Sequence, residues 1–211
     1  MKLNCFSRPP KFPTRFIMMI LGVLVQGFGL SLLIQIDLGT DPWTSTFLGV
    51  SNLTGIGFGT CHLIGSLVLF LVVFFSDNSK IGFGTLGNMI CCGYVADFFR
   101  WAWENSGIST FFENPVVCWC MLIPALFIFM TGCSAYLCAD LGGSPYDVMP
   151  FIISNRLPKI PFRFVRIGWD TSFLIIGFLA SGPVGIVNIL FAFCFGPVIS
   201  WYQKKFAVFL R

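Results

Sequence analysis

The segment Asp37-Leu-Gly-Thr-Asp-Pro-Trp-Thr44 returns 103 residues later as Asp140-Leu-Gly-Gly-Ser-Pro-Tyr-Asp147. In the surrounding stretches, residues 29–52 and 132–155, 8 of 24 positions are identical without a gap. Such an internal repeat indicates that the chain consists of two related halves. Membrane proteins built in this way usually have their working site where the halves meet.

The composition indicates a membrane protein. Hydrophobic residues make up 56% of the 211 positions and charged residues only 10%, whereas a soluble domain has about 25% charged residues. The chain therefore has too few charged side chains to cover a soluble globule, and we expect it to contact the lipid bilayer directly. No nucleic-acid partner is expected, because the basic residues do not cluster on a soluble face.

Six stretches are long and apolar enough to cross a hydrocarbon core of roughly 30 Å as helices. The alternating pattern of a membrane β-barrel is missing, so the predicted fold class is an all-α polytopic membrane protein. The third and fifth stretches are the weakest, because they contain Asp97 and the Arg166/Asp170 pair. The predicted spans cover residues 16–36, 58–75, 81–101, 115–139, 164–180 and 184–201.

The basic residues predict the orientation. With six crossings and both termini in the cytoplasm, every one of the 13 Lys and Arg residues except Arg100 faces the cytoplasm. The predicted organisation is a cytoplasmic arm at residues 1–14, a first membrane repeat at 15–103, an outer loop at 104–114, a second membrane repeat at 115–203 and a cytoplasmic tail at 204–211.

Three crossings in each half make the halves point in opposite directions. We therefore predict a 3+3 inverted-topology repeat, an arrangement that is common in secondary transporters. If residues 44–52 and 147–155 were full crossings, the halves would instead be parallel. These segments of about ten residues are too short to span the bilayer.

The repeated segment predicts a helix break followed by a restart. In each copy a glycine, Gly39 or Gly142, follows the long apolar helix and suits the left-handed conformation that ends a helix. A capping residue and a proline come next, with Pro42 or Pro145 at the first position of a new helix. The predicted short helices cover residues 42–50 and 145–153.

Two interpretations of these short helices remain open. Each helix dips into the bilayer and directs its N-terminal amides at a bound solute, or each forms a corner at the membrane interface. In the first interpretation, the candidate solute-binding residues are Asp41, Trp43, Ser144, Tyr146 and Asp147, which line a cavity from its two ends.

Several short elements resemble a known family. They are Leu38-Gly39, Pro42-Trp43, Ser51-Asn52, Gly84-Thr85, and Gly93 with Asp97. Over residues 15–203 the chain resembles the YczE/YyaS/YitT family of bacterial integral membrane proteins. The resemblance implies a multi-pass protein of the bacterial cytoplasmic (inner) membrane with a possible transport role, and it assigns no catalytic or ligand residues. Gly196 and Ser200 occupy the places of Gly93 and Asp97 in the second half, which argues against a function that needs an acid at both.

Polar residues inside the spans are costly in lipid and therefore informative. Asp170 lies one turn from Arg166 on the same helix face. Either the two form a structural pair, with Arg166 reaching toward the cytoplasmic surface, or Asp170 binds the proton or ion that couples transport. His62, the only histidine, is expected near the outer interface, neutral and hydrogen bonded. Gln26 and Asn88 are expected to form hydrogen bonds between helices.

No enzyme motif is present, and the nine cysteines lack the spacing of a zinc site. We therefore expect no catalytic residue, metal or cofactor. The first functional hypothesis is a permease or transport subunit for an unknown small solute. The alternative is a non-transporting membrane partner or regulatory subunit of another assembly. A second copy of the chain, as a homodimer, or a membrane partner subunit is the possible protein partner. A permease should have a polar cavity lined by both copies of the repeated segment, whereas a partner protein should be packed solid with its glycine faces exposed.

Overall fold

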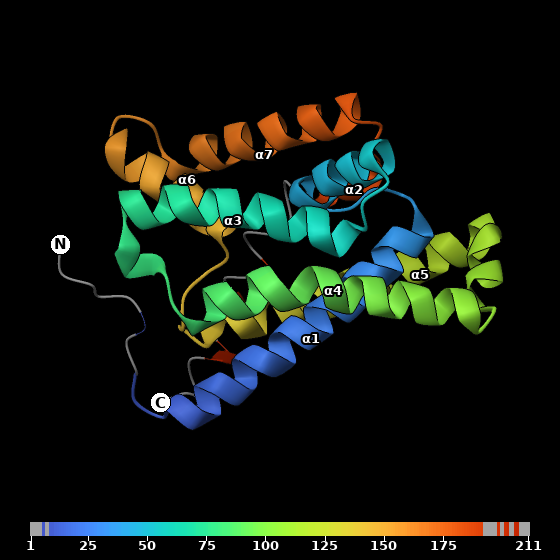
Figure 1. Ribbon diagram of the computed structural model, residues 1–211, viewed down its shortest axis with the longest axis horizontal. Helices are drawn as coiled ribbons and strands as arrows, with labels where there is room; N and C mark the ends of the chain where they lie inside the picture. Colours follow the sequence, from blue (N-terminus) through green and yellow to red (C-terminus); the bar gives the residue numbers. More distant parts are fainter. Residues whose placement is uncertain (1–5, 7–8, 192–197, 199–200, 203–204, 207–211) are drawn as a thin grey trace.

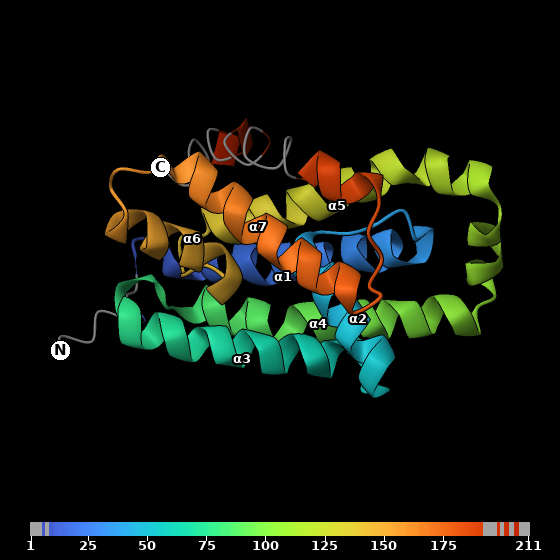
Figure 2. The ribbon, with the colours of Figure 1, turned by 90° about the horizontal axis from the view of Figure 1, so that it is seen from above.

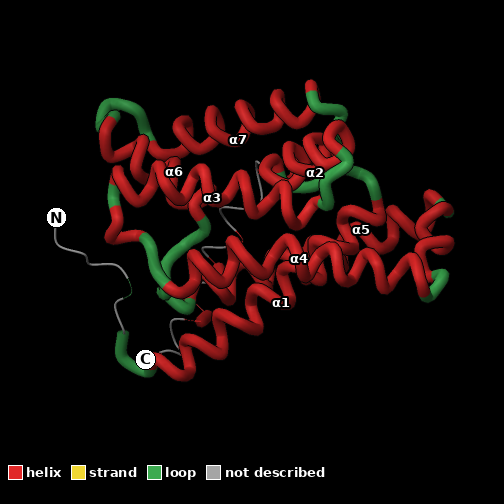
Figure 3. The backbone as a smooth tube through the Cα atoms, in the orientation of Figure 1, coloured by secondary structure: helices red, strands yellow, loops and turns green. Residues whose placement is uncertain are grey.

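The computed structural model describes residues 6, 9–191, 198, 201–202 and 205–206. Its secondary structure consists of helices, and the described residues contain no strand (Figure 3). The long helices are α1 (Phe12–Ile36), α3 (Phe58–Ser76), α4 (Phe83–Asn105), α5 (Pro115–Cys138) and α7 (Phe162–Leu179). The short helices are α2 (Pro42–Thr54) and α6 (Pro145–Arg156). Two 3-10 turns, Asn78–Lys80 and Ile108–Glu113, follow α3 and α4.

The helices follow the predicted spans closely. Residues 186–191 are helical, and most of the rest of the sixth predicted span, at 184–201, lies outside the described residues. Among the described helices, α1, α3 and α5 are long and apolar enough to cross a membrane. Helices α4 and α7 are less apolar because they contain Asp97 and the Arg166/Asp170 pair. The chain is therefore a membrane-embedded helical protein.

The spacing of the helices repeats along the chain. Helix α5 begins 103 residues after α1, and α6 begins 103 residues after α2. Helix α7 begins 104 residues after α3, so the second half contains one additional residue before it. The sequence repeat thus extends beyond the identical positions to the helix boundaries.

The helices of the two halves pack across one another. In Figure 1, α1, α4 and α5 lie together in the lower part of the molecule and α2, α3, α6 and α7 in the upper part. The short helix α2 packs on α7 of the second half, and its counterpart α6 packs on α3 of the first half. Figure 2 shows the same molecule from above, with α6 beside α7.

The two longest apolar helices, α1 and α5, touch through their backbones. A Cβ atom at Gly29 would lie 2.6 Å from the Phe129 nitrogen, and one at Gly132 would overlap the backbone of Gln26. A Cβ atom at Gly22 would lie 2.6 Å from the Tyr136 nitrogen. Small residues allow this close approach between helices in lipid, so the core depends on bare glycine at these positions.

Alanine substitution tests the contact between α1 and α5. Gly132→Ala is expected to destabilise the protein by about 1–3 kcal/mol, because the added methyl group overpacks the interface. Gly168→Ala on α7 is the matched control, since nothing lies within 4 Å of its Cβ position and alanine favours a helix by about 1 kcal/mol over glycine. The measurement is the unfolding temperature of the purified protein in detergent. Equal unfolding temperatures for Gly132→Ala and the wild type would contradict the packing.

Candidate functional site

The first copy of the repeated segment connects α1 to α2 through a left-handed turn. Asp37 and Gly39 have φ angles of 55° and 97°, in the region that favours glycine at a helix end. A Cβ atom at Gly39 would also overlap the side-chain oxygen of Asn188. Asp41 then caps α2 by accepting a hydrogen bond from the Thr44 N–H at 3.0 Å.

The second copy has the same geometry between α5 and α6. Asp140 and Gly142 have φ angles of 55° and 100°. Ser144 caps α6 by accepting a hydrogen bond from the Asp147 N–H at 3.2 Å, and both short helices begin with a proline. In both copies, one helix ends and another begins within the segment, in agreement with the sequence pattern.

The beginning of α2 is buried on all sides. Residues 42–46 are all buried, and five helical residues turn through more than a full circle. An amphipathic helix at the membrane interface keeps one polar face toward water. The start of α2 therefore does not behave as an interfacial helix.

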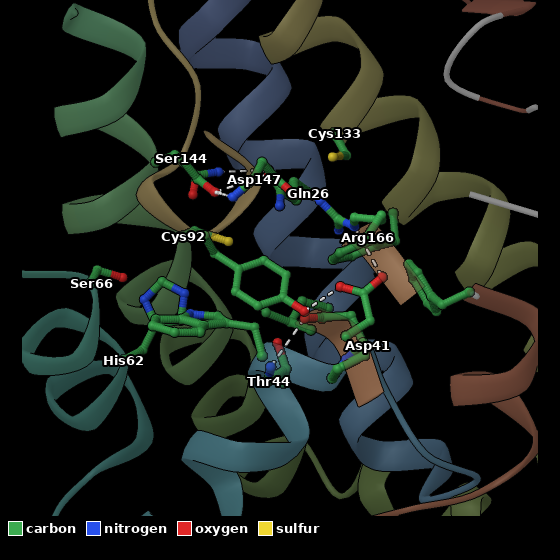
Figure 4. A pocket seen from close by; sticks show the side chains of 18 residues that line it. Gln26, Asp41, Thr44, His62, Ser66, Cys92, Cys133, Ser144, Asp147 and Arg166 are labelled. Atoms are coloured by element: carbon green, nitrogen blue, oxygen red, sulfur yellow. Dashed lines mark hydrogen bonds and ion pairs between the residues drawn. The ribbon is translucent and has the colours of Figure 1, made fainter. Parts of the chain in front are cut away.

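The N-termini of α2 and α6 meet at a cavity of about 50 Å³ (Figure 4). A space of this size holds roughly three or four water molecules. All six candidate residues from the sequence line it, so the fold brings both copies of the repeated segment to one place. These residues are Asp41, Trp43, Ser144, Tyr146, Asp147 and Asp170.

Equivalent residues of the two halves face the cavity in pairs. Six pairs are separated by the 103 residues of the repeat, and two pairs on α3 and α7 by 104 residues. The cavity therefore lies where equivalent elements of the halves meet. The pairs are Gln26 with Phe129, Leu30 with Cys133, Asp41 with Ser144, Trp43 with Tyr146, Thr44 with Asp147, Asn88 with Phe191, His62 with Arg166, and Ser66 with Asp170.

Arg166 joins two acidic side chains of the second half. Its Nη1 lies 3.2 Å from Asp147 Oδ1, and its Nε lies 2.9 Å from Asp170 Oδ2. Tyr146 donates its hydroxyl to Asp170 at 2.6 Å, and Tyr136 donates its hydroxyl to Asp147 at 3.2 Å. Each carboxylate thus has a cationic and a hydroxyl partner, which offsets part of the cost of burying its charge.

The predicted Arg166–Asp170 pair is present. The Arg166 side chain is 21% exposed and lines the cavity. The reason is Asp147 at the start of α6, a partner that is 19 positions away in the sequence.

Asp41 lacks such a counter-charge. Its carboxylate accepts the Thr44 N–H and forms no ion pair within the part of the chain that the structure describes. Next to it, the Trp43 ring packs against Tyr146 and Phe173, with centroids 5.1 and 5.3 Å apart. An acid without an ion-pair partner, Asp41, and the aromatic ring of Trp43 therefore lie next to each other in the cavity wall.

His62 differs from its prediction. It is buried, lines the cavity and packs edge-on against Trp43, with ring centroids 6.0 Å apart. Its Nδ1 has no hydrogen-bond partner among the described residues. His62 corresponds to Arg166 if one residue is inserted in the second half, and this correspondence is the signal that could have placed it in the site.

Two amide side chains close the cavity on the side of the first half. Asn88 donates a hydrogen bond to the side-chain oxygen of Gln26 at 2.8 Å, and this bond links α4 to α1. The predicted role in bonding between helices is confirmed. Their place in the cavity wall was not predicted, because the sequence does not show which face of α1 turns toward α2.

The fold and the cavity define a helical membrane protein with a polar cavity between two related halves. The chain belongs to the family of unknown function DUF6198, whose model matches residues 13–204.

Two bacterial relatives extend over most of the chain. An uncharacterized protein of Haemophilus influenzae is 26% identical over 190 residues, which cover 90% of this chain and 83% of the relative. The uncharacterized protein YyaS of Bacillus subtilis is 25% identical over 179 residues, which cover 85% of this chain and 87% of the relative. The match to YyaS confirms the family resemblance noted in the sequence. No solved structure matches the chain.

Neutralising Arg166 tests the ion network. Arg166→Met is expected to destabilise the protein by about 3–5 kcal/mol, because it leaves two buried carboxylates without their cation. The triple variant Arg166→Met, Asp147→Asn, Asp170→Asn should recover most of this loss, since it removes all three charges together. Thermal unfolding in detergent measures both effects. A single variant as stable as the wild type, or a triple variant less stable than the single one, would contradict the network.

Proposed function

We propose that the protein is a permease for a small solute, in which the cavity opens alternately to the two sides of the membrane. The main support is the cavity itself, because equivalent residues of both halves line it. Secondary transporters bind their substrates at such a junction between repeats. No catalytic step is proposed for the cavity.

An inverted arrangement with three crossings in each half is part of this proposal. Helices α2 and α6 contain 13 and 12 residues, about 20 Å of helix at roughly 1.5 Å per residue. They are too short for a core of about 30 Å, so we count them as re-entrant. The halves then have an odd number of crossings and opposite orientations.

The packing across the halves supplies a mechanism for alternating access. The contact of α2 with α7 and the contact of α6 with α3 join equivalent elements in opposite combinations. If the halves are inverted, loosening one contact opens the cavity toward one side of the membrane, and loosening the other opens it toward the opposite side. Two contacts between equivalent elements suit this exchange.

The alternative, a non-transporting membrane partner, has less support. It predicts solid packing and exposed glycine faces, whereas the described part of the chain has a polar cavity. The glycines at the contact of α1 with α5 are buried by that contact. A transport subunit that needs a partner protein, or a homodimer, is compatible with the cavity. Uptake by the protein reconstituted alone separates a complete permease from such a subunit.

Asp170 is the proposed site of proton or ion coupling. It shares Arg166 with Asp147 on α6. A proton or cation that neutralises Asp170 would weaken its bond to Arg166 and leave the guanidinium to Asp147 alone. Occupancy of Asp170 on α7 would thereby change the contact between α6 and α7.

The native cysteines test alternating access. Cys92 and Cys133 are buried and line the cavity, whereas Cys118 is buried on α5 outside it. In vesicles of either orientation, a membrane-impermeant thiol reagent should modify Cys92 and Cys133 faster than Cys118, because each side gains access in turn. Mass spectrometry of the labelled peptides measures the rates. Modification of the cavity thiols from one side only, or no faster than Cys118, would contradict the permease.

Reporter fusions test the inverted arrangement and the cellular location. A fluorescent protein that matures only in the cytoplasm should fluoresce when fused after residue 80, 158 or 211, and should stay dark after residue 107 or 182. The reason is that basic residues flank the first three positions and not the last two. A periplasmic enzyme at the same positions should give the reverse pattern. Activity of one reporter at all five positions would contradict the six crossings.

A further inference from the structure

The cavity wall contains more negative than positive charge. Three carboxylates, Asp41, Asp147 and Asp170, face one guanidinium, Arg166. The N-termini of α2 and α6 each contribute about half a positive elementary charge. With His62 neutral and the three carboxyl groups ionised, the described lining residues then have one negative charge without compensation.

An anionic solute would find few free donors at the helix ends. Asp41 already accepts the Thr44 amide at the start of α2, and Ser144 accepts the Asp147 amide at the start of α6. Each short helix also begins with a proline, which has no N–H group. The helix ends are thus occupied by acceptors of the chain itself, so the site does not favour an anion.

Two acceptors in the cavity wall are not fully satisfied within the described residues. Asp41 accepts the Thr44 N–H but forms no ion pair. His62 is 4% exposed, and its Nδ1 has no hydrogen-bond partner. Burying an acceptor without a partner, as at His62, costs about 1–3 kcal/mol. A ligand with N–H groups would donate to both acceptors.

Aromatic side chains line the cavity beside Asp41. Trp43 and Tyr146 come from equivalent positions of the two halves, and their ring centroids lie 5.1 Å apart. Aromatic faces attract organic cations within about 6 Å. Arg166 already lies over the Tyr146 ring, with its Cζ 5.3 Å from the centroid. The Trp43 ring is therefore the one that adds to the preference for an organic cation over a strongly hydrated one.

The size of the cavity limits the ligand. About 50 Å³ corresponds to roughly three or four water-sized positions. This space suits an ion such as methylammonium or guanidinium.

We propose that the cavity binds one compact monovalent organic cation, a small ammonium or guanidinium ion, with its charge against the Asp41 carboxylate. This assignment rests on the proposed permease function and names the class of its substrate. The chain's own Arg166 holds the other two carboxylates, so that Asp41 receives the solute.

Equilibrium binding to the purified full-length protein tests the assignment. The probes are methylammonium and guanidinium, with sodium as the inorganic cation and formate as the anion, at constant ionic strength and well below denaturing concentrations. Calorimetric titration should detect methylammonium or guanidinium at one site, and neither sodium nor formate should compete. Equal binding of sodium, or preferential binding of formate, overturns the assignment.

Two Asp→Asn variants test which carboxylate binds the cation. Asp41→Asn keeps the cap of α2, because Asn caps helices as well as Asp, but it should weaken cation binding by about tenfold or more, since it removes a charge-assisted contact. Asp37→Asn is the matched control: Asp37 is exposed and has a left-handed conformation that Asn tolerates. Equal losses in the two variants, or no loss in Asp41→Asn, overturn the role of Asp41.

A third variant separates binding from folding. His62→Leu removes the unpartnered nitrogen, so the protein should unfold at the same or a higher temperature, yet bind methylammonium several times more weakly. Unchanged cation affinity in a folded His62→Leu protein counts against the proposal.

The experiments distinguish an error in the proposed substrate class from an error in the proposed permease function. Cysteine access from both sides without cation binding overturns the cation assignment and leaves the permease intact. Cation binding that depends on Asp41, together with cavity thiols that stay inaccessible, supports the cation site and removes the transport function.

Discussion

The fold depends on how the backbone groups at two helix breaks form their hydrogen bonds inside a membrane protein. Lipid offers no hydrogen bonds, so irregular backbone must be paired within the protein. At the two breaks, the carbonyl of Leu38 accepts the N–H of Val187 at 3.2 Å, and the carbonyl of Leu141 accepts the N–H of Gly84 at 2.7 Å. Each bond joins one half of the chain to the other. These two hydrogen bonds therefore hold the halves together and place the N-termini of α2 and α6 at the junction between them.

Much of this local structure could be predicted from the sequence, because its causes are local. Apolar runs of about 20 residues define membrane helices, and the left-handed glycine, cap and proline define the breaks at Gly39 and Gly142. The repeat also predicts one contact between distant parts of the sequence, because equivalent segments meet when two halves pack symmetrically. For this reason Asp41 and Ser144 could be assigned to one cavity in advance.

Side-chain directions within the spans could not be predicted in the same way. His62 and Arg166 point into the cavity because of the rotation of α3 and α7, and a nearly uniform apolar helix such as α3 contains little information about its rotation. The one-residue difference in spacing between these helices also hides the pairing of His62 with Arg166. Such features depend on tertiary packing, which the local pattern does not determine.

At three pairs of equivalent positions in the cavity, the two halves share the ability to form hydrogen bonds but not charge. Asp41, Asp147 and Asp170 correspond to the neutral hydroxyls of Ser144, Thr44 and Ser66. Each hydroxyl can donate or accept, as its position requires, but it has no charge. The two halves can thus exchange their contacts at similar cost in free energy. The charge in the cavity comes from the same side chains in both arrangements. A permease of this kind would present one binding chemistry to both sides of the membrane, because the charges that recognise the solute stay fixed while the contacts around them alternate.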